Sequence, residues 1–276
     1  MKLVSFSTDG EAPRVGYLEG DEIHPLGLPG GSMLEFIEHG RSADRQPGGE
    51  SVPLEEARLH APVVRPGKII CIGLNYEDHA EETGAERPEK PIVFAKYPNT
   101  IIGPGEPIRI PPITEQADYE AELAVVIGQP AKNVSESEAL DYVFGYTNCN
   151  DVSSRDLQFS EGGQWTRSKS HDTFAPIGPY IATRDEVPDP QNLSIRCVLN
   201  GEVMQDGTTS DMIFSVAELI SFLSTGMTLV PGDLIATGTP AGVGFVREPK
   251  VFLKAGDEVT VEIEGLGSLT NPVEAA

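Results

Sequence analysis

Short alternating runs of hydrophobic and polar residues mark the first forty positions of the chain. Such alternation between turn residues is typical of β-strands with one buried face. The predicted strands cover residues 3–7, 14–18 and 22–26. Ser32 is a suitable N-cap for a short helix that ends at Gly40. The apolar side of that helix contains Met33, Leu34, Phe36 and Ile37. The pattern predicts a small α+β unit.

Gly and Pro then interrupt the pattern twice, at residues 41–53 and 62–67. We therefore predict a small N-terminal α+β domain at 1–63 and a larger catalytic domain at 64–276. Strands of the larger domain are predicted at 68–73, 91–96, 118–128, 144–151, 193–204 (a hairpin around Asn200 and Gly201), 234–237 and 258–264. Its predicted helices cover 135–143 and 215–223, the second with a capping box from Ser215 to Glu218. The fold class is α+β and rich in β-structure.

The apolar run at 118–128 carries three carboxylates in its first half, and two of them predict a metal site. Side chains alternate faces along a strand, so Glu120 and Glu122 point the same way. Two carboxylates this close repel each other unless a cation lies between them. Mg²⁺ or Mn²⁺ accepts such oxygen ligands and keeps positions open for water and substrate. Asp151, at the end of another predicted strand, can supply a third ligand.

Each of these features also has an ordinary structural explanation. An amphipathic strand can expose Glu120 and Glu122 to water, and Asp151 can act as an N-cap with Arg155 as its salt-bridge partner. The apolar residues at 125–127 favour a buried strand over a solvated one. From the residues alone, both interpretations stay open.

Overall charge narrows the classes of partner. The chain has 20 basic and 43 acidic residues and a net charge of −23, which disfavours nucleic acid and anionic membranes as partners. The sequence contains no bilayer-spanning apolar run and begins without a signal peptide, so we expect a cytoplasmic protein. Three widely spaced cysteines, at 71, 149 and 197, argue against a disulfide framework or a zinc site.

Further polar groups lie at positions where they can take part in chemistry. His79 and Glu82 share one face of a helix if residues 77–84 are helical, and can form an acid/base pair or a solvated helix surface. Lys96 ends a predicted buried strand and can be a simple surface cation, whereas Lys169 can bind an anionic substrate. The only tryptophan, Trp165, is expected to serve packing. The glycines of the loop 238–244 would let backbone N–H groups approach an anion.

Taken in order, several motifs resemble the fumarylacetoacetate hydrolase family from about residue 62 to the C-terminus. They are Gly73-Leu74-Asn75-Tyr76 with His79 and Glu82, Phe94-Ala95-Lys96, Tyr119-Glu120-Ala121-Glu122, Asn150-Asp151 with Arg155 and Gln158, Lys169 with Asp172-Thr173, and Gly238-Thr239-Pro240-Ala241-Gly242-Val243-Gly244. The resemblance implies a mixed β-sandwich roll and a homodimer. It also implies that Glu120, Glu122 and Asp151 bind Mg²⁺ or Mn²⁺.

The resemblance further implies a small-molecule substrate with a 2-oxo acid head. His79, oriented by Glu82, would activate water, and Lys169 would stabilise an enolate. Lys96, Arg155, Gln158 and Thr239 would bind the substrate. His171 departs from the family pattern, where an aromatic or small residue is expected.

The function expected first is metal-dependent hydrolysis of a carbon–carbon bond in a 2,4-dioxo acid: an acylpyruvate, a fumarylacetoacetate-like acid or a sugar-derived diketo acid. Decarboxylation or isomerisation of a 2-oxo or 2-hydroxymuconate-type acid on the same metal site is the alternative within the family. A non-catalytic, metal-binding interaction protein is the alternative from another class.

Overall fold

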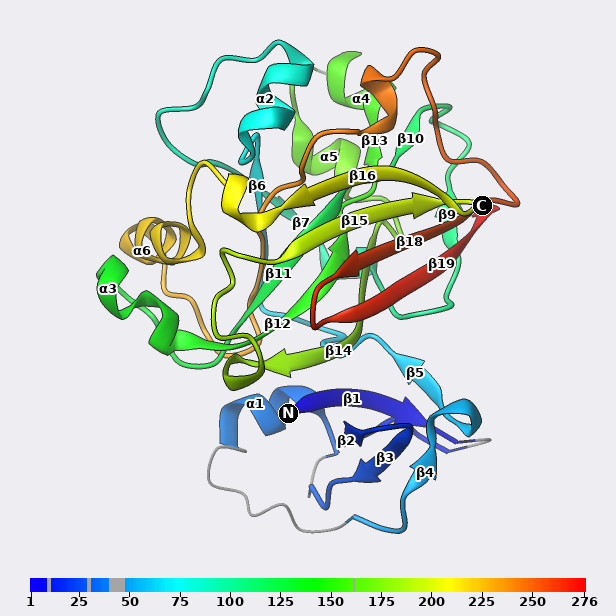
Figure 1. Ribbon diagram of the computed structural model, residues 1–276, viewed down its shortest axis with the longest axis vertical. Coiled ribbons are helices and arrows are strands. Elements are labelled where there is room, and N and C mark those ends of the chain that lie inside the picture. Colours follow the sequence, from blue (N-terminus) through cyan, green and yellow to red (C-terminus); the bar gives the residue numbers. More distant parts are fainter. Residues whose placement is uncertain (9–10, 29–30, 40–47, 161) are drawn as a thin grey trace.

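The fold of the chain is seen in a computed structural model, which describes residues 1–8, 11–28, 31–39, 48–160 and 162–276. Figure 1 shows a small N-terminal unit at one end and helices α2 (Glu77–Thr83), α4 (Arg155–Ser160) and α5 (Trp165–Lys169) gathered at the other end. β-structure fills the space between them, so the predicted α+β, β-rich class is confirmed. The predicted helix stop at Gly40 and most of the predicted linker 41–53 lie outside the described residues.

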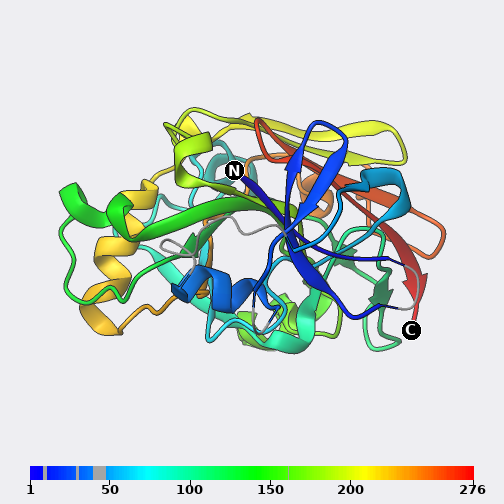
Figure 2. The ribbon, with the colours of Figure 1, turned by 90° about the horizontal axis from the view of Figure 1, so that it is seen from below.

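The N-terminal unit contains the strands and the helix that the sequence pattern predicts. Its elements are β1 (Lys2–Ser7), β2 (Arg14–Glu19), β3 (Glu22–Pro25), α1 (Met33–His39), β4 (Val52–Pro53) and β5 (Arg58–His60). The Ser32 hydroxyl accepts a hydrogen bond from the Glu35 N–H at 3.2 Å, as expected for the start of a helix. Figure 2, from below, shows these strands in front of the rest of the chain.

One large sheet runs through both parts of the chain. Its strands in the larger part are β6 (Ile69–Gly73), β7 (Ile92–Lys96), β8 (Ile101–Ile102), β11 (Ala121–Ile127), β12 (Val143–Asn150), β14 (Ala175–Thr183) and β17 (Leu234–Ala236). The order across the described residues is β4-β3-β2-β1-β14-β12-β11-β17-β6-β7, with β5 on β1 and β8 on β14. Because β1 pairs with β14, the N-terminal unit continues the sheet of the larger part.

A second sheet completes the sandwich. It contains β9 (Ile108–Ile110), β15 (Ser194–Leu199), β16 (Glu202–Thr208), β18 (Glu258–Ile263) and β19 (Gly267–Ala275), in the order β16-β15-β18-β19-β9. Asn200 and Gly201 form the predicted hairpin turn, with φ values of 52° and 83°. Strands β11, β12 and β14 of the large sheet contact this second sheet. The main core lies between the two layers, around buried residues such as Leu123, Val125 and Val261.

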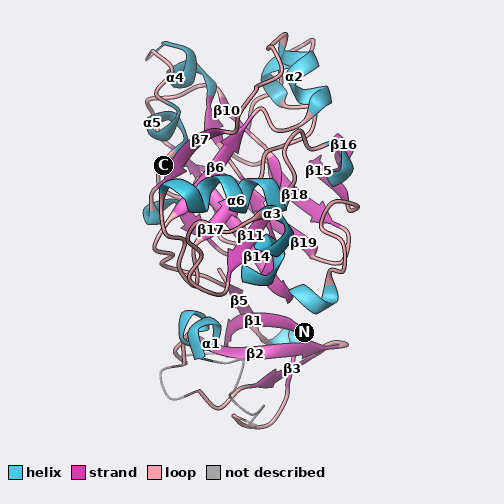
Figure 3. Cartoon of the chain, turned by 90° about the vertical axis from the view of Figure 1, so that its left-hand side faces the viewer, coloured by secondary structure: helices cyan, strands magenta, loops and turns pink. Residues whose placement is uncertain are grey.

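The remaining helices lie at the margin of the sheets. Helix α6 (Val216–Gly226) starts with the predicted capping box, because the Ser215 hydroxyl accepts from the Glu218 N–H and the Glu218 carboxylate accepts from the Ser215 N–H. The predicted helix 135–143 is shorter, with α3 (Glu136–Ala139) followed by a 3-10 turn at Leu140–Tyr142. Figure 3 shows α3 and α6 side by side. No helix in the described part of the chain is long and apolar enough to cross a membrane.

Two strand predictions need correction. The run 118–128 is interrupted: β10 (Ala117–Asp118) pairs with β13 (Ser153–Ser154), and β11 begins only at Ala121. Strand β7 forms where predicted, but its residues are largely exposed because it is the outermost strand of the large sheet. Its final residue, Lys96, is buried instead of lying on the surface. Both departures occur beside the acidic residues of the predicted site.

Candidate active site and metal centre

Three buried carboxylates meet where β11 and β12 lie side by side. Glu120 immediately precedes β11, Glu122 lies within it, and Asp151 follows β12. The antiparallel pairing sets Ala121 opposite Asn150, and the Asp151 N–H donates to the Glu120 carbonyl oxygen at 2.9 Å. One oxygen from each carboxylate lies within 4.8 Å of the others. The structure thus brings the three predicted metal ligands together.

Three buried cations surround this acidic cluster. Lys169 Nζ lies 2.8 Å from both Glu120 Oε2 and Asp151 Oδ2. Lys96 Nζ lies 2.5 Å from Asp151 Oδ1, and Arg155 Nη2 lies 2.7 Å from Glu120 Oε1. Asp151 therefore ion-pairs with two lysines and does not cap a helix, since α4 begins only at Arg155.

The charges within the cluster are unevenly compensated. Burial opposes the ionisation of Glu120, but Lys169 and Arg155 lower its pKa to about 2. Burial raises the pKa of Glu122 well above its usual range, and the neighbouring Asp151 and Glu120 raise it further. The Gly238 N–H, at 2.9 Å, is the hydrogen-bond donor to Glu122 among the described residues. Hard oxygen ligands with one uncompensated carboxylate fit a divalent cation such as Mg²⁺ or Mn²⁺.

The predicted acid/base pair lies on helix α2. His79 Nδ1 and Glu82 Oε1 are 2.7 Å apart, which the three-residue spacing on a helix makes possible. The other oxygen of Glu82 accepts a hydrogen bond from the Gly242 N–H at 2.8 Å. His79 is 6 % exposed, so the solvated-helix interpretation does not hold for it. The pair leaves Nε2 as the imidazole nitrogen not engaged by Glu82.

A cavity of about 220 Å³ joins the pair to the acidic cluster. Of the predicted site residues, it is lined by His79, Glu120, Glu122, Arg155, Gln158, Lys169 and Thr239. Its remaining lining is mainly apolar and includes Leu74, Phe94, Phe159, Trp165 and Phe245. Glu82, Lys96 and Asp151 lie behind this first layer, where they contact other site residues. The cavity thus has a charged end and an aromatic wall.

Lys96 and Arg155 are engaged by the protein itself. Lys96 does not line the cavity, and its second contact is the Val152 carbonyl oxygen at 3.1 Å. Arg155 donates to Gln158 Oε1 at 3.0 Å through Nη1, in addition to its contact with Glu120. Their geometry indicates that both cations position carboxylates, whereas substrate binding by either residue stays a prediction.

The backbone N–H groups of the glycine-rich loop after β17 donate to carboxylate side chains of the protein itself. The Gly238 N–H donates to Glu122 and the Gly242 N–H to Glu82. Asp118 accepts from the N–H groups of Gly244, at 2.8 Å, and Phe245, at 3.1 Å. Thr239 Oγ1 donates to the Ala121 carbonyl oxygen at 2.8 Å while its side chain lines the cavity. The loop therefore connects the acidic cluster with helix α2.

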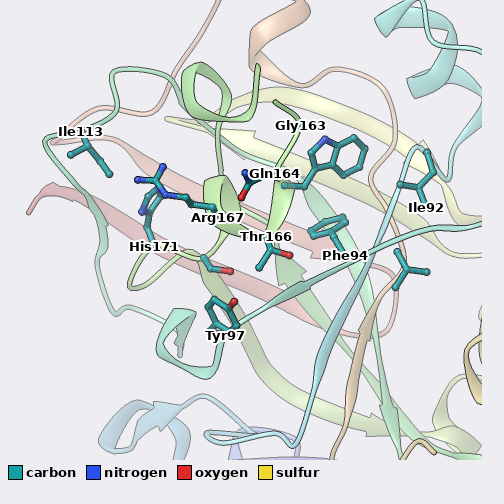
Figure 4. Close-up of a pocket in the computed structure, with 12 residues that line it drawn as sticks. Ile92, Phe94, Tyr97, Ile113, Gly163, Gln164, Thr166, Arg167 and His171 are labelled. Carbon is teal, nitrogen blue, oxygen red and sulfur yellow. The ribbon is translucent and has the colours of Figure 1, made fainter. Parts of the chain in front are cut away.

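Phe94 and Trp165 line both this cavity and a second one. The second cavity, of about 1000 Å³, shares Phe94 and Trp165 with the first and is shown in Figure 4. His171 lines the second cavity and packs edge-on against Phe174 with ring centroids 5.1 Å apart. Trp165 thus forms a wall of the candidate site, which the packing interpretation of its sequence did not predict.

The residues of the site that the sequence analysis did not predict fall into two groups. The aromatic wall formed by Phe159 and Phe245 has no sequence signal, because its members come from separate segments. Asp118 did have one, as the third carboxylate of the run that supplies Glu120 and Glu122. It is fully buried, and burial raises its pKa while Arg155 and the Gly244 N–H oppose that rise.

Comparison with known proteins identifies the family of the chain. The family described as "Fumarylacetoacetate (FAA) hydrolase C-terminal" matches residues 68–274, and "Rv2993c-like, N-terminal" matches residues 1–62. The mitochondrial oxaloacetate tautomerase fahd2 of Xenopus laevis is 45% identical over 287 residues, covering 99% of this chain and 90% of that protein.

Solved structures extend the similarity to the whole fold. A fumarylacetoacetate hydrolase of Exiguobacterium antarcticum superposes with a TM-score of 0.90 at 40% identity, covering 100% of both chains. A 5-carboxymethyl-2-hydroxymuconate delta-isomerase of Mycobacterium smegmatis does so with a TM-score of 0.84 at 36% identity, again covering 100% of both chains. The chain belongs to the fumarylacetoacetate hydrolase family of enzymes.

Proposed function

We propose that the protein is a divalent-metal-dependent enzyme that interconverts the enol and keto forms of a small 2-oxo dicarboxylic acid of the oxaloacetate type. The observation that carries this proposal is His79, held by Glu82 at 2.7 Å, in the same 220 Å³ cavity as a buried carboxylate cluster. Tautomerisation needs a proton carrier beside an activated carbonyl group, and these residues supply both parts.

Glu120, Glu122 and Asp151 would hold the metal ion. When bound, Mg²⁺ or Mn²⁺ withdraws electron density from the 2-oxo group and acidifies the neighbouring C–H bond. In the keto-to-enol direction His79 Nε2 would remove a proton from C3 and leave an enolate, whose oxygen then takes a proton from water. In the reverse direction the enol oxygen loses its proton to water and protonated His79 returns a proton to C3. Glu82 holds the imidazole by Nδ1 and stabilises its protonated form. Lys169 places a positive charge beside the oxygen that becomes negative as the enolate forms.

Cavity size and the relatives support a small substrate. A volume of about 220 Å³ lies below the range of about 300–1,000 Å³ usual for drug-sized ligands. Two relatives that match 99% of the chain, from Xenopus laevis and Rattus norvegicus, are named oxaloacetate tautomerases, whereas two from Burkholderia species are named putative hydrolases. Isomerases occur among the similar structures.

Hydrolysis of a carbon–carbon bond in a 2,4-dioxo acid is the second candidate. His79 and Glu82 favour it, because the same pair can deprotonate a water molecule. Decarboxylation would use the metal without that water. The three reactions differ in their products. Tautomerisation gives a keto acid of unchanged composition, hydrolysis of an acylpyruvate gives pyruvate and a second acid, and decarboxylation releases carbon dioxide.

The proposal is tested by measuring the enol absorbance of oxaloacetate over time in the presence of chelator, of Mg²⁺ or of Mn²⁺. We expect metal-dependent acceleration of enol loss that Glu120→Ala abolishes and that His79→Asn lowers by about 10²- to 10⁴-fold, the usual contribution of a general acid/base. His60→Asn is the matched control, since His60 binds Ser7 outside the site. Metal-dependent pyruvate release from acetylpyruvate without enol turnover would replace the proposal by hydrolysis.

A further inference from the structure

Asp118 is a buried acid with a dense set of donors that the proposed chemistry does not use. Its side chain is 0 % exposed. Oδ1 accepts from the N–H groups of Tyr119 at 2.9 Å and Gly244 at 2.8 Å. Oδ2 accepts from Arg155 Nε at 2.8 Å and from the Phe245 N–H at 3.1 Å. Four donors converge on one carboxylate that does not line the catalytic cavity.

Two of these contacts lead directly into the site. Arg155, held through Nε by Asp118, reaches Glu120 Oε1 with Nη2 at 2.7 Å. Phe245, held through its N–H, lines the cavity, and its ring lies 4.5 Å from the Arg155 guanidinium. Asp118 thus contacts both the partner of a predicted metal ligand and a residue of the aromatic wall.

The contact between the loop backbone and Asp118 requires a glycine at position 244. A Cβ atom there would lie 2.6 Å from Asp118 Oδ1 and 1.8 Å from the Val251 carbonyl oxygen. A side chain larger than hydrogen would therefore displace the loop from the carboxylate. The close approach lets the loop contact Asp118 through its backbone.

We propose that Asp118 is a positioning residue that couples the metal ligand Glu120 to the aromatic wall of the cavity, by holding Arg155 and the 244–245 backbone on one carboxylate. Its catalytic consequence rests on the proposed function, whereas its effect on the metal ligand does not. Outer-shell partners of metal ligands typically change metal affinity or activity by about 10- to 100-fold when mutated.

Asp118→Asn isolates the contribution of the carboxylate with little change of shape. An amide presents one acceptor oxygen and one N–H₂ donor, so one of the two donor pairs would face another donor. Either Tyr119 and Gly244 or Arg155 and Phe245 lose their acceptor. In the first orientation the loop loses its Gly244 contact but keeps the one from Phe245, and in the second Arg155 and Phe245 are both released, so either orientation breaks part of the connection between the loop and Arg155.

Asp233→Asn is the matched control for burial and charge. Asp233 is also 0 % exposed, ion-pairs with Lys68 at 2.6 Å and accepts from the Val230 N–H at 2.7 Å. It precedes β17 at the end opposite to the glycine-rich loop. It therefore reproduces the loss of a buried charged acceptor away from the acidic cluster.

The experiment is a Mn²⁺ titration of each folded variant, read by fluorescence of Trp165, the only tryptophan and a residue of the cavity wall. We expect Asp118→Asn to weaken Mn²⁺ binding by about 10- to 100-fold and to lower kcat with it. Asp233→Asn should lower the melting temperature yet retain the wild-type Kd and kcat. Arg155→Lys, which keeps the charge but cannot bridge Asp118 and Glu120, should weaken Mn²⁺ binding in the same way.

The outcomes test the positioning role of Asp118 separately from the proposed function. Wild-type Mn²⁺ affinity in folded Asp118→Asn, or in Arg155→Lys if Asp118→Asn does not fold, overturns the positioning role. Equal weakening by Asp233→Asn also overturns it, since that pattern indicates general destabilisation. If wild-type protein binds Mn²⁺ but does not convert oxaloacetate, while Asp118→Asn still weakens the binding, the proposed function fails and the positioning role stands.

Discussion

Replacing Lys169 by methionine tests how the site balances its charge. The lysine side chain is 3 % exposed, and its Nζ contacts Glu120 and Asp151 at 2.8 Å each. Burial alone would lower the pKa of Lys169, but Asp151 and Glu120 raise it, so the lysine stays charged in the fold. Methionine keeps an unbranched apolar side chain in the same space and removes the charge. The substitution leaves two buried carboxylates short of a partner.

The magnitude follows from the burial of this pair. Removing one member of a buried ion pair costs about 3–5 kcal/mol. With an unfolding entropy of about 2.1 cal/mol/K per residue, a chain of 276 residues loses about 1.7 °C in Tm per kcal/mol if it unfolds as one unit. We therefore expect Tm to fall by about 5–9 °C in chelator. A divalent cation supplies positive charge to the same carboxylates, so saturating Mn²⁺ should recover most of that loss.

Thermal unfolding in chelator and across a Mn²⁺ titration measures both quantities. Lys68→Met is the control, because Lys68 pairs with the buried Asp233 at 2.6 Å away from the cluster, and Mn²⁺ should not recover its loss. Turnover of Lys169→Met should stay about 10²- to 10³-fold low even when Tm is restored, if the lysine also stabilises the enolate. An unchanged Tm in chelator, or the same Mn²⁺ shift in wild type and variant, would refute the charge argument.

Three further predictions concern other groups of the site and its surroundings. The raised pKa of Glu122 means that the metal-free fold binds this proton more tightly than the unfolded chain does, so stability falls as pH rises through the folded-state pKa. Glu122→Gln should consequently be more stable than wild type in chelator at alkaline pH but not at acid pH, as Tm measured against pH will show. Glu82→Gln should lower kcat by about 10²- to 10⁴-fold with unchanged Mn²⁺ affinity, since an amide can donate to His79 Nδ1 and reverse the tautomer. The homodimer stays a prediction, and we expect its interface at the second cavity (Figure 4). The exposed apolar side chains there are Ile92, Val93, Tyr97 and Ile113. No described residue that lines this cavity is acidic, although the net charge of the chain is −23. Light scattering should show a smaller mass for Val93→Asp but not for Val203→Asp, an equally apolar exposed site on β16, and unchanged masses would reject that interface.

The shared direction of Glu120 and Glu122 could be predicted because it is local to one strand, whereas Asp151 was one possible third ligand from the residues alone and was assigned to the metal by the family resemblance. Strand alternation determines that Glu120 and Glu122 share a direction, and the turn after an adjacent strand brings Asp151 to them. The strand is interrupted before Ala121, yet Glu120 still lies with Glu122 in the cluster, as strand alternation predicted. The pairing of His79 with Glu82 is local for the same reason, within one turn of helix.

The positions of the cations could not be predicted in this way. Lys96 resembled a surface cation because it ends a strand before a loop rich in Pro and Gly. Its burial depends on Asp151, fifty-five residues further along the chain, whose carboxylate compensates the cost of removing a lysine from water. Such a contact is made by tertiary packing, and hydrophobic periodicity carries no information about it.

The glycine-rich loop shows how this limit bears on function. Its glycines correctly predicted that backbone N–H groups approach anions, but the acceptors are Glu122, Glu82 and Asp118. An N–H group that already donates to a buried carboxylate is not free to bind the carboxylate of a substrate. The head of the proposed 2-oxo acid substrate would then be held by Lys169, whose ammonium keeps a third N–H beyond the two that it donates to Glu120 and Asp151, and by the proposed metal ion. The loop is thus better understood as a support that holds the acids of the site in register than as a substrate-binding loop.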